Sequence, residues 1–232
     1  MGYLPKQVSY GQIFRAWRLR STIVIFAGMN ADRTEKLRAV LDKRQPNLTV
    51  ILENVFDPHN IAAVMRTCDA VGIQEIFIIR TKIPLRKKWG SKSSSGAIKW
   101  LTIHQFENVD ECIAEVRSRY DRIYTTHLAT DSVGLYELDL TQKVALVFGN
   151  ESAGCSSQIL AHTDGNFVIP QMGIIQSLNI SVACAVTIYE AHRQKKAAGH
   201  YDSPSLPFAQ RLQLTKEWAM YDEWMQLKDS IH

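Results

Sequence analysis

The sequence predicts an α/β protein with a mainly parallel sheet flanked by helices. Short apolar, β-branched segments alternate with amphipathic helical segments through most of the 232 residues. Glycine and proline lie between many of these segments, as is typical of loops that join strands to helices. Open sheets of this kind bind ligands outside the carboxyl ends of their strands, so the loops that follow the strands are the candidate sites.

Each predicted element follows from its hydrophobic pattern. Leu37, Val40 and Leu41 share one face of the first helix, which ends before Pro46. The second helix ends at Gly72. The predicted helices are 32–43, 60–71, 108–120, a short helix within 152–163, 176–196 and a last helix that contains Trp218 and Trp224. The predicted strands are 48–56, 73–79, 101–106, 122–128, 143–150 and 165–170.

Composition narrows the class of protein. A net charge of +4 and a pI near 8.8 permit a polyanionic partner without requiring one. The cysteines form no CxxC pair and no cluster with histidines, which favours reduced, buried thiols in the cytosol and disfavours a metal site. No apolar run approaches the roughly 18 residues that indicate a membrane span. These cysteines are Cys68, Cys112, Cys155 and Cys184.

Residues 1–28 have three interpretations. Basic residues precede a short apolar run at 23–27, which loosely resembles a secretory signal but is not clearly followed by a small-residue cleavage site. Translation could instead begin at Met29. The segment could also be an extra helix or strand that packs on the domain.

Two loops after predicted strands carry polar residues. Gly149 and Glu151 follow the strand 143–150, where glycine permits close backbone approach to a ligand. The loop lacks the lysine of a P-loop, and no GxGxxG occurs in the chain. After the strand 165–170, Ser177 and Asn179 enter an otherwise apolar helix. Gln176 or Ser177 acting as a simple helix cap explains that pattern as well.

Arg66 is an unusual cation within the helix 60–71, because small alanines surround it. An exposed ion pair with Asp69, three residues on, is the plainer explanation. The alternative is a cation that faces a ligand, with Asn60 as the N-cap of its helix.

Three segments occur together in a fixed order: "NIAAVMRTCDAVG", "VALVFGNESAGCS" and "IPQMGIIQSLNISVACAV". They resemble the signature motifs of the SpoU class of RNA ribose 2′-O-methyltransferases, within the SPOUT superfamily. Over roughly residues 32–204 the chain is similar to the members that methylate guanosine 18 in the tRNA D-loop. The resemblance implies a C-terminal deep trefoil knot, S-adenosylmethionine as cofactor, no metal, a homodimer and a cytoplasmic enzyme that binds tRNA.

The resemblance also implies a domain division and residue roles. It separates an N-terminal extension (1–31), a methyltransferase domain with a helical lead-in (32–200) and a helical tail (201–232). The catalytic positions are Arg66, Asn60, Glu151, Ser177 and Asn179. The cofactor-binding positions are Thr126, Gly149, Ile169 and Leu178. The acceptor of the hydroxyl proton stays open, because a guanidinium is effectively always protonated.

RNA binding is expected from basic side chains, about half of which we expect to contact phosphates. Arg33, Arg38, Lys87, Lys88, Lys99 and Arg193 are the foremost candidates, followed by Lys36, Arg44, Arg80, Lys82, Arg86 and Lys92. Two other functions stay open: methylation of a different tRNA or ribosomal RNA nucleotide, and non-catalytic RNA binding on the same fold.

Overall fold

The computed structural model describes residues 31–82, 96–175 and 177–229. The chain divides into two compact units. One is Asp42–Leu206, and the described elements of the other are α2 (Ala31–Asp42) and α7 (Phe208–Asp229). The predicted leading and final helices are thus both present. The sequence-based division instead grouped the leading helix with the sheet. Gln176, Lys87, Lys88 and the segment 1–28 lie outside the described residues.

The larger unit is built on one seven-stranded sheet, in the order β3-β2-β1-β6-β4-β7-β5. Every pairing between neighbouring strands is parallel, which confirms the predicted class of sheet. The two-residue strand β5 was not predicted. The strands are β1 (Leu48–Glu53), β2 (Glu75–Ile79), β3 (Thr102–Phe106), β4 (Arg122–Thr126), β5 (Val133–Gly134), β6 (Val144–Phe148) and β7 (Gly165–Val168).

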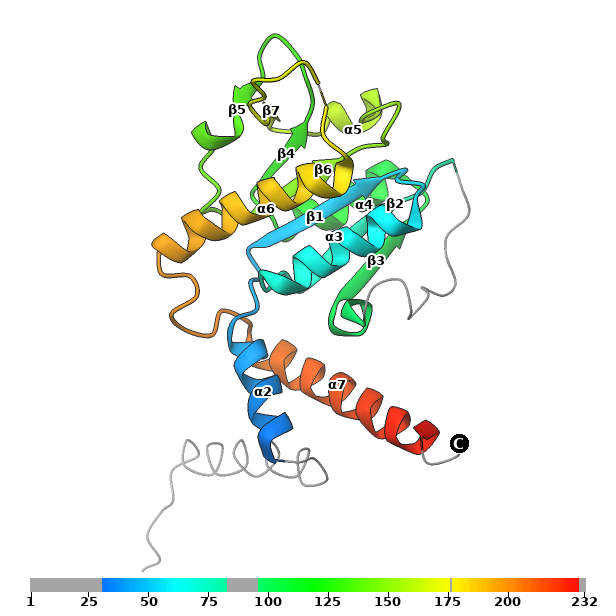
Figure 1. The fold of residues 1–232 in the computed structure, drawn as a ribbon, viewed down its shortest axis with the longest axis vertical. Coiled ribbons are helices and arrows are strands. Elements are labelled where there is room, and N and C mark those ends of the chain that lie inside the picture. The colour runs from blue at the N-terminus through cyan, green and yellow to red at the C-terminus, as the bar shows by residue number, and fades with distance from the viewer. Residues whose placement is uncertain (1–30, 83–95, 176, 230–232) are drawn as a thin grey trace, which may run out of the picture. The chain divides into compact units, whose positions relative to one another are not determined.

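Helices cover both faces of this sheet (Figure 1). Val50 and Leu52 of β1 pack in the cluster that holds α3 and α6, whereas Ile51 packs on the opposite side with α4 and α5. Strands buried on both faces explain why they read as continuous apolar runs. The helices are α3 (Pro58–Ala70), α4 (Val109–Arg117), α5 (Ser157–Leu160) and α6 (Ile180–Ala197), with short 3-10 turns at Ala97–Trp100 and Leu135–Glu137.

All four cysteines are free and buried, as predicted. Cys68 and Cys184 belong to one side of the core, and Cys112 and Cys155 to the other. Burial raises the pKa of Cys112 and that of Cys155 to about 12. The thiols therefore stay protonated at neutral pH and act as small apolar side chains.

Gly72 ends α3 as predicted, in a left-handed conformation with φ of 87°. A Cβ at this position would lie 2.4 Å from the carbonyl oxygen of Lys43. Glycine is therefore needed both for the backbone angle and for the close approach of the two segments.

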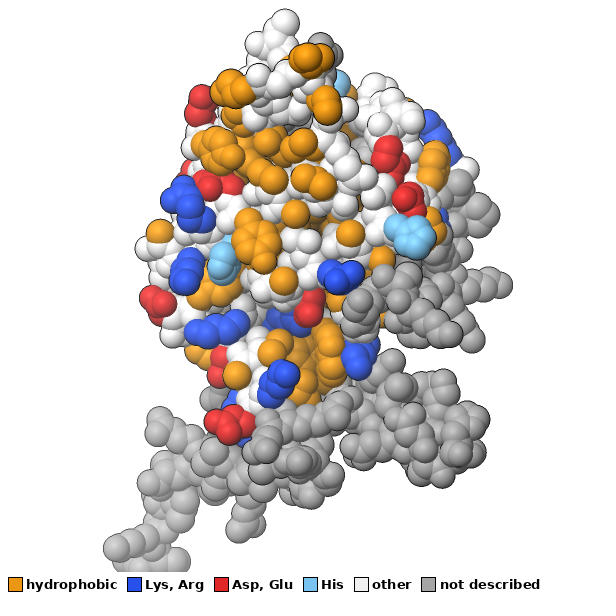
Figure 2. All heavy atoms as spheres, viewed as in Figure 1, with side chains coloured by type: hydrophobic (Ala, Val, Ile, Leu, Met, Phe, Trp, Pro, Cys, Tyr) orange, Lys and Arg blue, Asp and Glu red, His pale blue; other side chains and the backbone are white. Residues whose placement is uncertain are grey.

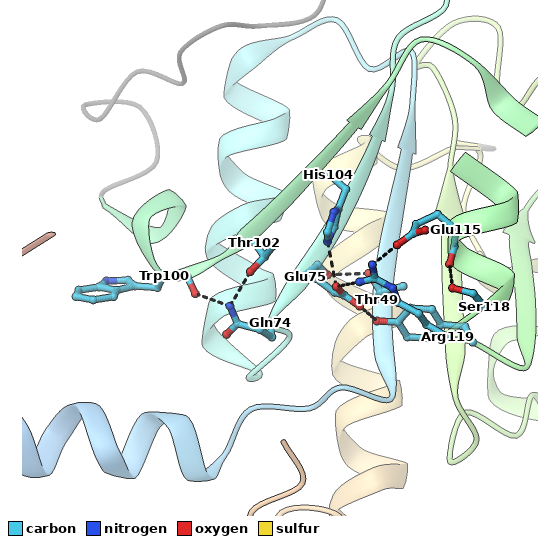
Figure 3. A network of polar contacts seen from close by, with 10 residues as sticks. Thr49, Gln74, Glu75, Trp100, Thr102, His104, Glu115, Ser118 and Arg119 are labelled. Atoms are coloured by element: carbon cyan, nitrogen blue, oxygen red, sulfur yellow. Dashed lines mark hydrogen bonds and ion pairs between the residues drawn. The ribbon is translucent and has the colours of Figure 1, made fainter. Parts of the chain in front are cut away.

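A polar network at the amino ends of the strands joins β2 to β3 and to the end of α4 (Figure 3). Glu75 Oε2 lies 3.0 Å from His104 Nε2 and accepts from Arg119 at 2.5 Å, while the Tyr120 hydroxyl donates to Glu75 Oε1. Arg119 also contacts Glu115. Burial alone would raise the pKa of Glu75, but these hydrogen bonds and the Arg119 charge hold it below its ordinary value. The network anchors the edge of the sheet opposite to the candidate site.

Candidate active site

The candidate site lies at the carboxyl edge of the sheet, where the strand order reverses. From β1 the chain continues outward through β2 and β3, whereas β6 adjoins β1 on the other side. The loops after β1 and β6 therefore meet at a topological switch point, the usual place for a ligand in such sheets.

Side chains from the three motifs meet at this point. Asn60 Nδ2 donates to Glu151 Oε1 at 3.0 Å, and Asn179 Nδ2 donates to Asn60 Oδ1 at 3.2 Å. These residues are separated by 91 and 119 positions in the sequence. The hydrogen bonds therefore depend on the fold, and they orient the central amide at both of its ends.

Asn60 lies in the first turn of α3 and does not cap it. Asp57 is the N-cap, because its carboxylate accepts from His59 N at 2.8 Å and Pro58 occupies the first helical position. The prediction that Asn60 caps the helix is wrong for this reason. The Asn60 side chain is left available to bond Glu151 and Asn179.

Asn179 is the N-cap of α6, and its side chain accepts from Ser181 N at 2.8 Å. The helix starts at Ile180, so the interpretation that Gln176 or Ser177 caps it is wrong. Ser177 and Leu178 lie instead in the exposed loop before the helix. The Asn179 side chain thus caps a helix through its oxygen and bonds Asn60 through its nitrogen.

Arg66 is exposed on α3, six residues after Asn60. None of the hydrogen bonds or ion pairs between described residues involves it. Asp69, the partner in the plainer explanation, pairs with Arg44 at 2.6 Å. The plainer explanation, an Arg66–Asp69 ion pair, is therefore wrong, and the exposed Arg66 has no partner among the described residues.

The residues expected to bind the cofactor come together at the ends of three adjacent strands. Thr126 ends β4, while Gly149 and Ile169 directly follow β6 and β7, and β4 lies between those two strands. Thr126 Oγ1 donates to the carbonyl of Val147 at 3.3 Å, which ties β4 to β6 at this edge. Leu178 follows in the loop before α6.

Gly149 is required by a close approach of two backbone segments. A Cβ there would lie 2.3 Å from the backbone carbon of Gly154 and 2.4 Å from Cys155 N. Any other residue would displace the turn that carries Glu151, because contacts this short do not occur for real side chains.

The basic residues proposed for RNA binding have different environments. Arg44 and Arg80 are buried, so their expected role as surface phosphate contacts is wrong. Arg44 instead donates to Ile73 O at 3.0 Å and to Asp69, joining α3 to the segment that precedes β1. Arg38 and Lys82 are exposed.

Two further basic candidates have partners on their own elements. Lys99 Nζ lies 4.7 Å from the centre of the Trp100 ring, and Arg193 pairs with Glu190 at 2.8 Å. Arg33 belongs to α2, and its side chain is outside the described part of that helix.

Three polar residues of the site were missed by the sequence analysis: Glu53, Asn54 and Asn150. Buried Glu53 accepts from the backbone N of Ser156 at 2.8 Å, and Asn150 Nδ2 donates to the carbonyl of Asn54 at 3.0 Å. The available signal was the polar pair "EN" inside the apolar run 48–56. It marks the true end of β1 at Glu53.

Within the described ranges, no three His, Cys, Asp or Glu side chains gather as metal ligands would. No helix in those ranges combines the length and apolarity needed to cross a bilayer.

Fold and site together define a class: an open, parallel α/β protein with an amide-rich polar site at the switch point of its sheet. The chain belongs to the SpoU rRNA Methylase family, whose model matches residues 47–189. It is 40% identical over 176 residues to the tRNA (guanosine(18)-2'-O)-methyltransferase of Thermus thermophilus, an alignment that covers 75% of this chain and 89% of that protein.

Solved structures agree with the family assignment. The tRNA modifying enzyme TrmH/SpoU of A. aeolicus matches with a TM-score of 0.76 and 38% identity, covering 82% of this chain and 96% of that one. An rRNA methyltransferase from Sinorhizobium meliloti, crystallised with AdoMet, matches with a TM-score of 0.58 and 27% identity, covering 66% of this chain and 58% of that one.

Proposed function

We propose that the chain is an S-adenosylmethionine-dependent tRNA methyltransferase that acts on the ribose 2′-hydroxyl of guanosine 18. The observation that carries this proposal is the chain of hydrogen bonds from Asn179 through Asn60 to Glu151, with the exposed Arg66 on the same helix as Asn60. The names of the relatives from T. thermophilus and A. aeolicus support the choice of tRNA and, for the former, of the nucleotide.

The residues at the strand ends suit S-adenosylmethionine. Thr126, Gly149 and Ile169 offer backbone donors and acceptors at adjacent positions, which suits the polar edge of an adenine ring. Leu178 is 38% exposed and Ile174, in the same loop, is 99% exposed. Apolar side chains with this exposure provide surface that a ligand would cover. When bound, the cofactor supplies the methyl group as part of a positively charged sulfonium.

Arg66 is assigned the orientation and activation of the ribose. Its guanidinium keeps its charge and donates through a planar fork, which suits a ribose oxygen together with a neighbouring phosphate. Asn60 and Asn179 are neutral, so they position the substrate by hydrogen bonding without neutralising that charge. Glu151 holds Asn60, and Ser177 lies in the exposed loop one residue before Leu178.

The C-terminal trefoil knot of the family is part of the proposal. Strand β7 pairs with β4 on one side and with β5 on the other, although β4 and β5 are consecutive in the chain. The later strand thus lies between two earlier ones that the connection 127–132 joins, an arrangement that favours threading of the chain. Such threading is a rare exception to ordinary connection rules.

A homodimer through the outer face of α6 is also proposed. Val182 and Tyr189 are 47% and 52% exposed, and they lie seven residues apart on one side of the helix. Figure 2 shows hydrophobic side chains gathered on the molecular face that carries α6. An exposed apolar stripe on a helix that is otherwise packed favours a second copy as its partner.

The proposal also covers the cellular location, the domain bounds and the residues that contact tRNA phosphates. Binding of tRNA in the cytoplasm agrees with the buried free thiols, and the proposed methyltransferase domain, 32–200, includes most of the compact unit Asp42–Leu206. Phosphate contacts are assigned to six of the basic side chains, with a tRNA affinity that falls steeply as salt rises. These side chains are Arg33, Arg38, Lys87, Lys88, Lys99 and Arg193.

The test is methyl transfer from labelled S-adenosylmethionine to unmodified tRNA by the full chain. Transfer that depends on Arg66 supports the proposal. Cofactor and tRNA binding without turnover would instead assign the chain a non-catalytic role on RNA.

A further inference from the structure

Asn54 is the single non-glycine residue with a positive φ among those that the structure describes, at 51°. It directly follows β1 and is 5% exposed. The left-handed conformation is unfavourable for any residue with a Cβ, although asparagine tolerates it better than most. A buried asparagine held this way indicates that its backbone or side chain has a task at this point.

The side chain of Asn54 fixes the first residues after β2. Its Oδ1 accepts from Thr81 N at 3.0 Å and from Lys82 N at 3.3 Å, while its Nδ2 donates to Thr81 Oγ1 at 3.0 Å. Lys82 is one of the exposed cations proposed to contact RNA phosphate. Asn54 thus sets the path of the backbone beside that cation.

The main chain of Asn54 fixes the turn that carries Glu151. Its carbonyl accepts from Asn150 Nδ2 at 3.0 Å. Asn150 Oδ1 in turn accepts from the backbone N of Ser152 and of Ala153, each at 2.9 Å. The same Asn150 amide therefore closes the turn around Glu151 and fastens it to the end of β1.

These contacts form one continuous chain of hydrogen bonds. It passes from Thr81 to Asn54, then to Asn150 and its turn, and Glu151 of that turn reaches Asn60. The chain joins the exits of β2, β1 and β6, which are neighbours in the sheet.

We propose that Asn54 is a positioning residue for methyl transfer, which acts by holding the Glu151 turn and the backbone after β2 in a fixed mutual arrangement. The proposal rests on the proposed function of the site. It assigns a role to a residue outside the set that the three motifs supplied, and it explains why an asparagine occupies a left-handed position there.

Three variants separate this role from a merely structural one. Asn54→Gly keeps the left-handed backbone and the carbonyl that receives Asn150, but it removes every side-chain bond to Thr81 and Lys82. Asn54→Asp keeps the acceptor oxygen for the two backbone N–H groups. Asn108→Ala is the control for general destabilisation, since Asn108 caps α4 on the other face of the sheet through bonds to Asp110 N and Glu111 N, and alanine cannot replace that cap.

The measurements are kcat for methyl transfer to unmodified tRNA, the Kd for S-adenosylmethionine and the melting temperature. We expect kcat of Asn54→Gly to fall about tenfold, equivalent to about 1.4 kcal/mol, with the cofactor Kd within about twofold of wild type. Asn54→Asp should restore kcat to within about threefold. The control should lower the melting temperature and leave kcat within about twofold.

Amide hydrogen exchange gives a second readout that does not need turnover. Loss of the Asn54 side chain should speed exchange at Thr81 and Lys82, whose N–H groups lose their acceptor. It should also speed exchange at Ser152 and Ala153, because the Asn54 carbonyl that holds Asn150 is then fixed by the backbone alone. Wild-type kcat in Asn54→Gly overturns the proposal, and so does unchanged exchange at Ser152 and Ala153. A loss of kcat that the control reproduces overturns it as well, since general destabilisation would then explain the effect.

The wild-type reaction, run in the same assay, separates a failure of the proposed function from a failure of the role assigned to Asn54. Absence of transfer by wild type overturns the proposed function and this role with it. Transfer by wild type with unaltered kcat in Asn54→Gly overturns only the role of Asn54.

Discussion

Replacing Asn60 with aspartate tests the polar cluster by changing one side-chain nitrogen to oxygen while the shape of the side chain is kept. The nitrogen that donates to Glu151 Oε1 at 3.0 Å becomes an oxygen, so a hydrogen bond is replaced by two facing carboxylates. Loss of a hydrogen bond to a charged group costs about 1.5 kcal/mol. Repulsion adds about 1 kcal/mol, taking a water-like dielectric because Glu151 is exposed.

If about 2 kcal/mol of these two contributions raises the activation free energy of methyl transfer, kcat of Asn60→Asp should fall roughly thirtyfold. The deficit should narrow as pH is lowered from 8 towards 5, because one carboxyl of a like-charged pair takes up a proton more readily. Asn60→Ala lacks the extra charge, so its deficit should show no such recovery.

The assay is methyl transfer to unmodified tRNA at each pH, expressed as the ratio of variant to wild-type kcat. Asn108→Asp is the matched control, because aspartate is an equally good helix cap at that position, and its ratio should stay near one. A kcat for Asn60→Asp within about twofold of wild type at pH 8 would refute the reasoning, since that loss is smaller than one net hydrogen bond.

Three further predictions follow from individual residues. Arg66→Ala should abolish methyl transfer while the calorimetric Kd for S-adenosylmethionine stays within about twofold, because Arg66 is assigned to the ribose; full activity would contradict the assignment. Gly149→Ala should lower the melting temperature by about 5 °C, since its Cβ would lie within 2.4 Å of facing backbone. Gly173→Ala, whose Cβ would meet nothing within 4 Å, is the control, and equal melting temperatures would count against the packing argument. Burial lowers the pKa of Lys195 to about 8. Between pH 8 and 10 the unfolded chain therefore binds more protons than the folded one. The contribution of Lys195 to the free energy of unfolding therefore rises with pH in this window. The free energy of unfolding of wild type relative to Lys195→Met should therefore increase by about 2 kcal/mol across that window, and a constant difference in chemical denaturation would disprove it.

The centre of the sheet was predictable because β1, β2 and β6 are buried along their whole length and read as mostly apolar runs. Strand β5 escaped because two residues, Val133 and Gly134, carry no periodic signal. The starts of α3 and α6 were misplaced by a few residues. The N-caps are Asp57 and Asn179, and other polar residues that could serve as N-caps lie close to each of them in the sequence.

Only some members of the candidate site were predictable, since Glu53, Asn54 and Asn150 were missed, and its connections were not predictable. The Arg66–Asp69 pair was reasonable from spacing alone, yet Asp69 is occupied by Arg44, which lies 25 positions earlier in the sequence. The junction of Asn54 and Asn150 joins residues 96 positions apart. Only the order of the strands brings such residues together, and local sequence patterns carry no information about that order.

Mapping the methyl group on the product RNA tests the central claim most directly. Unmodified tRNA is incubated with the full chain and S-adenosylmethionine, then digested and analysed by mass spectrometry. We expect a single 2′-O-methylribose at guanosine 18 and none with Arg66→Ala. A methyl group on a base, on another nucleotide, or on the product of the Arg66→Ala variant would contradict it.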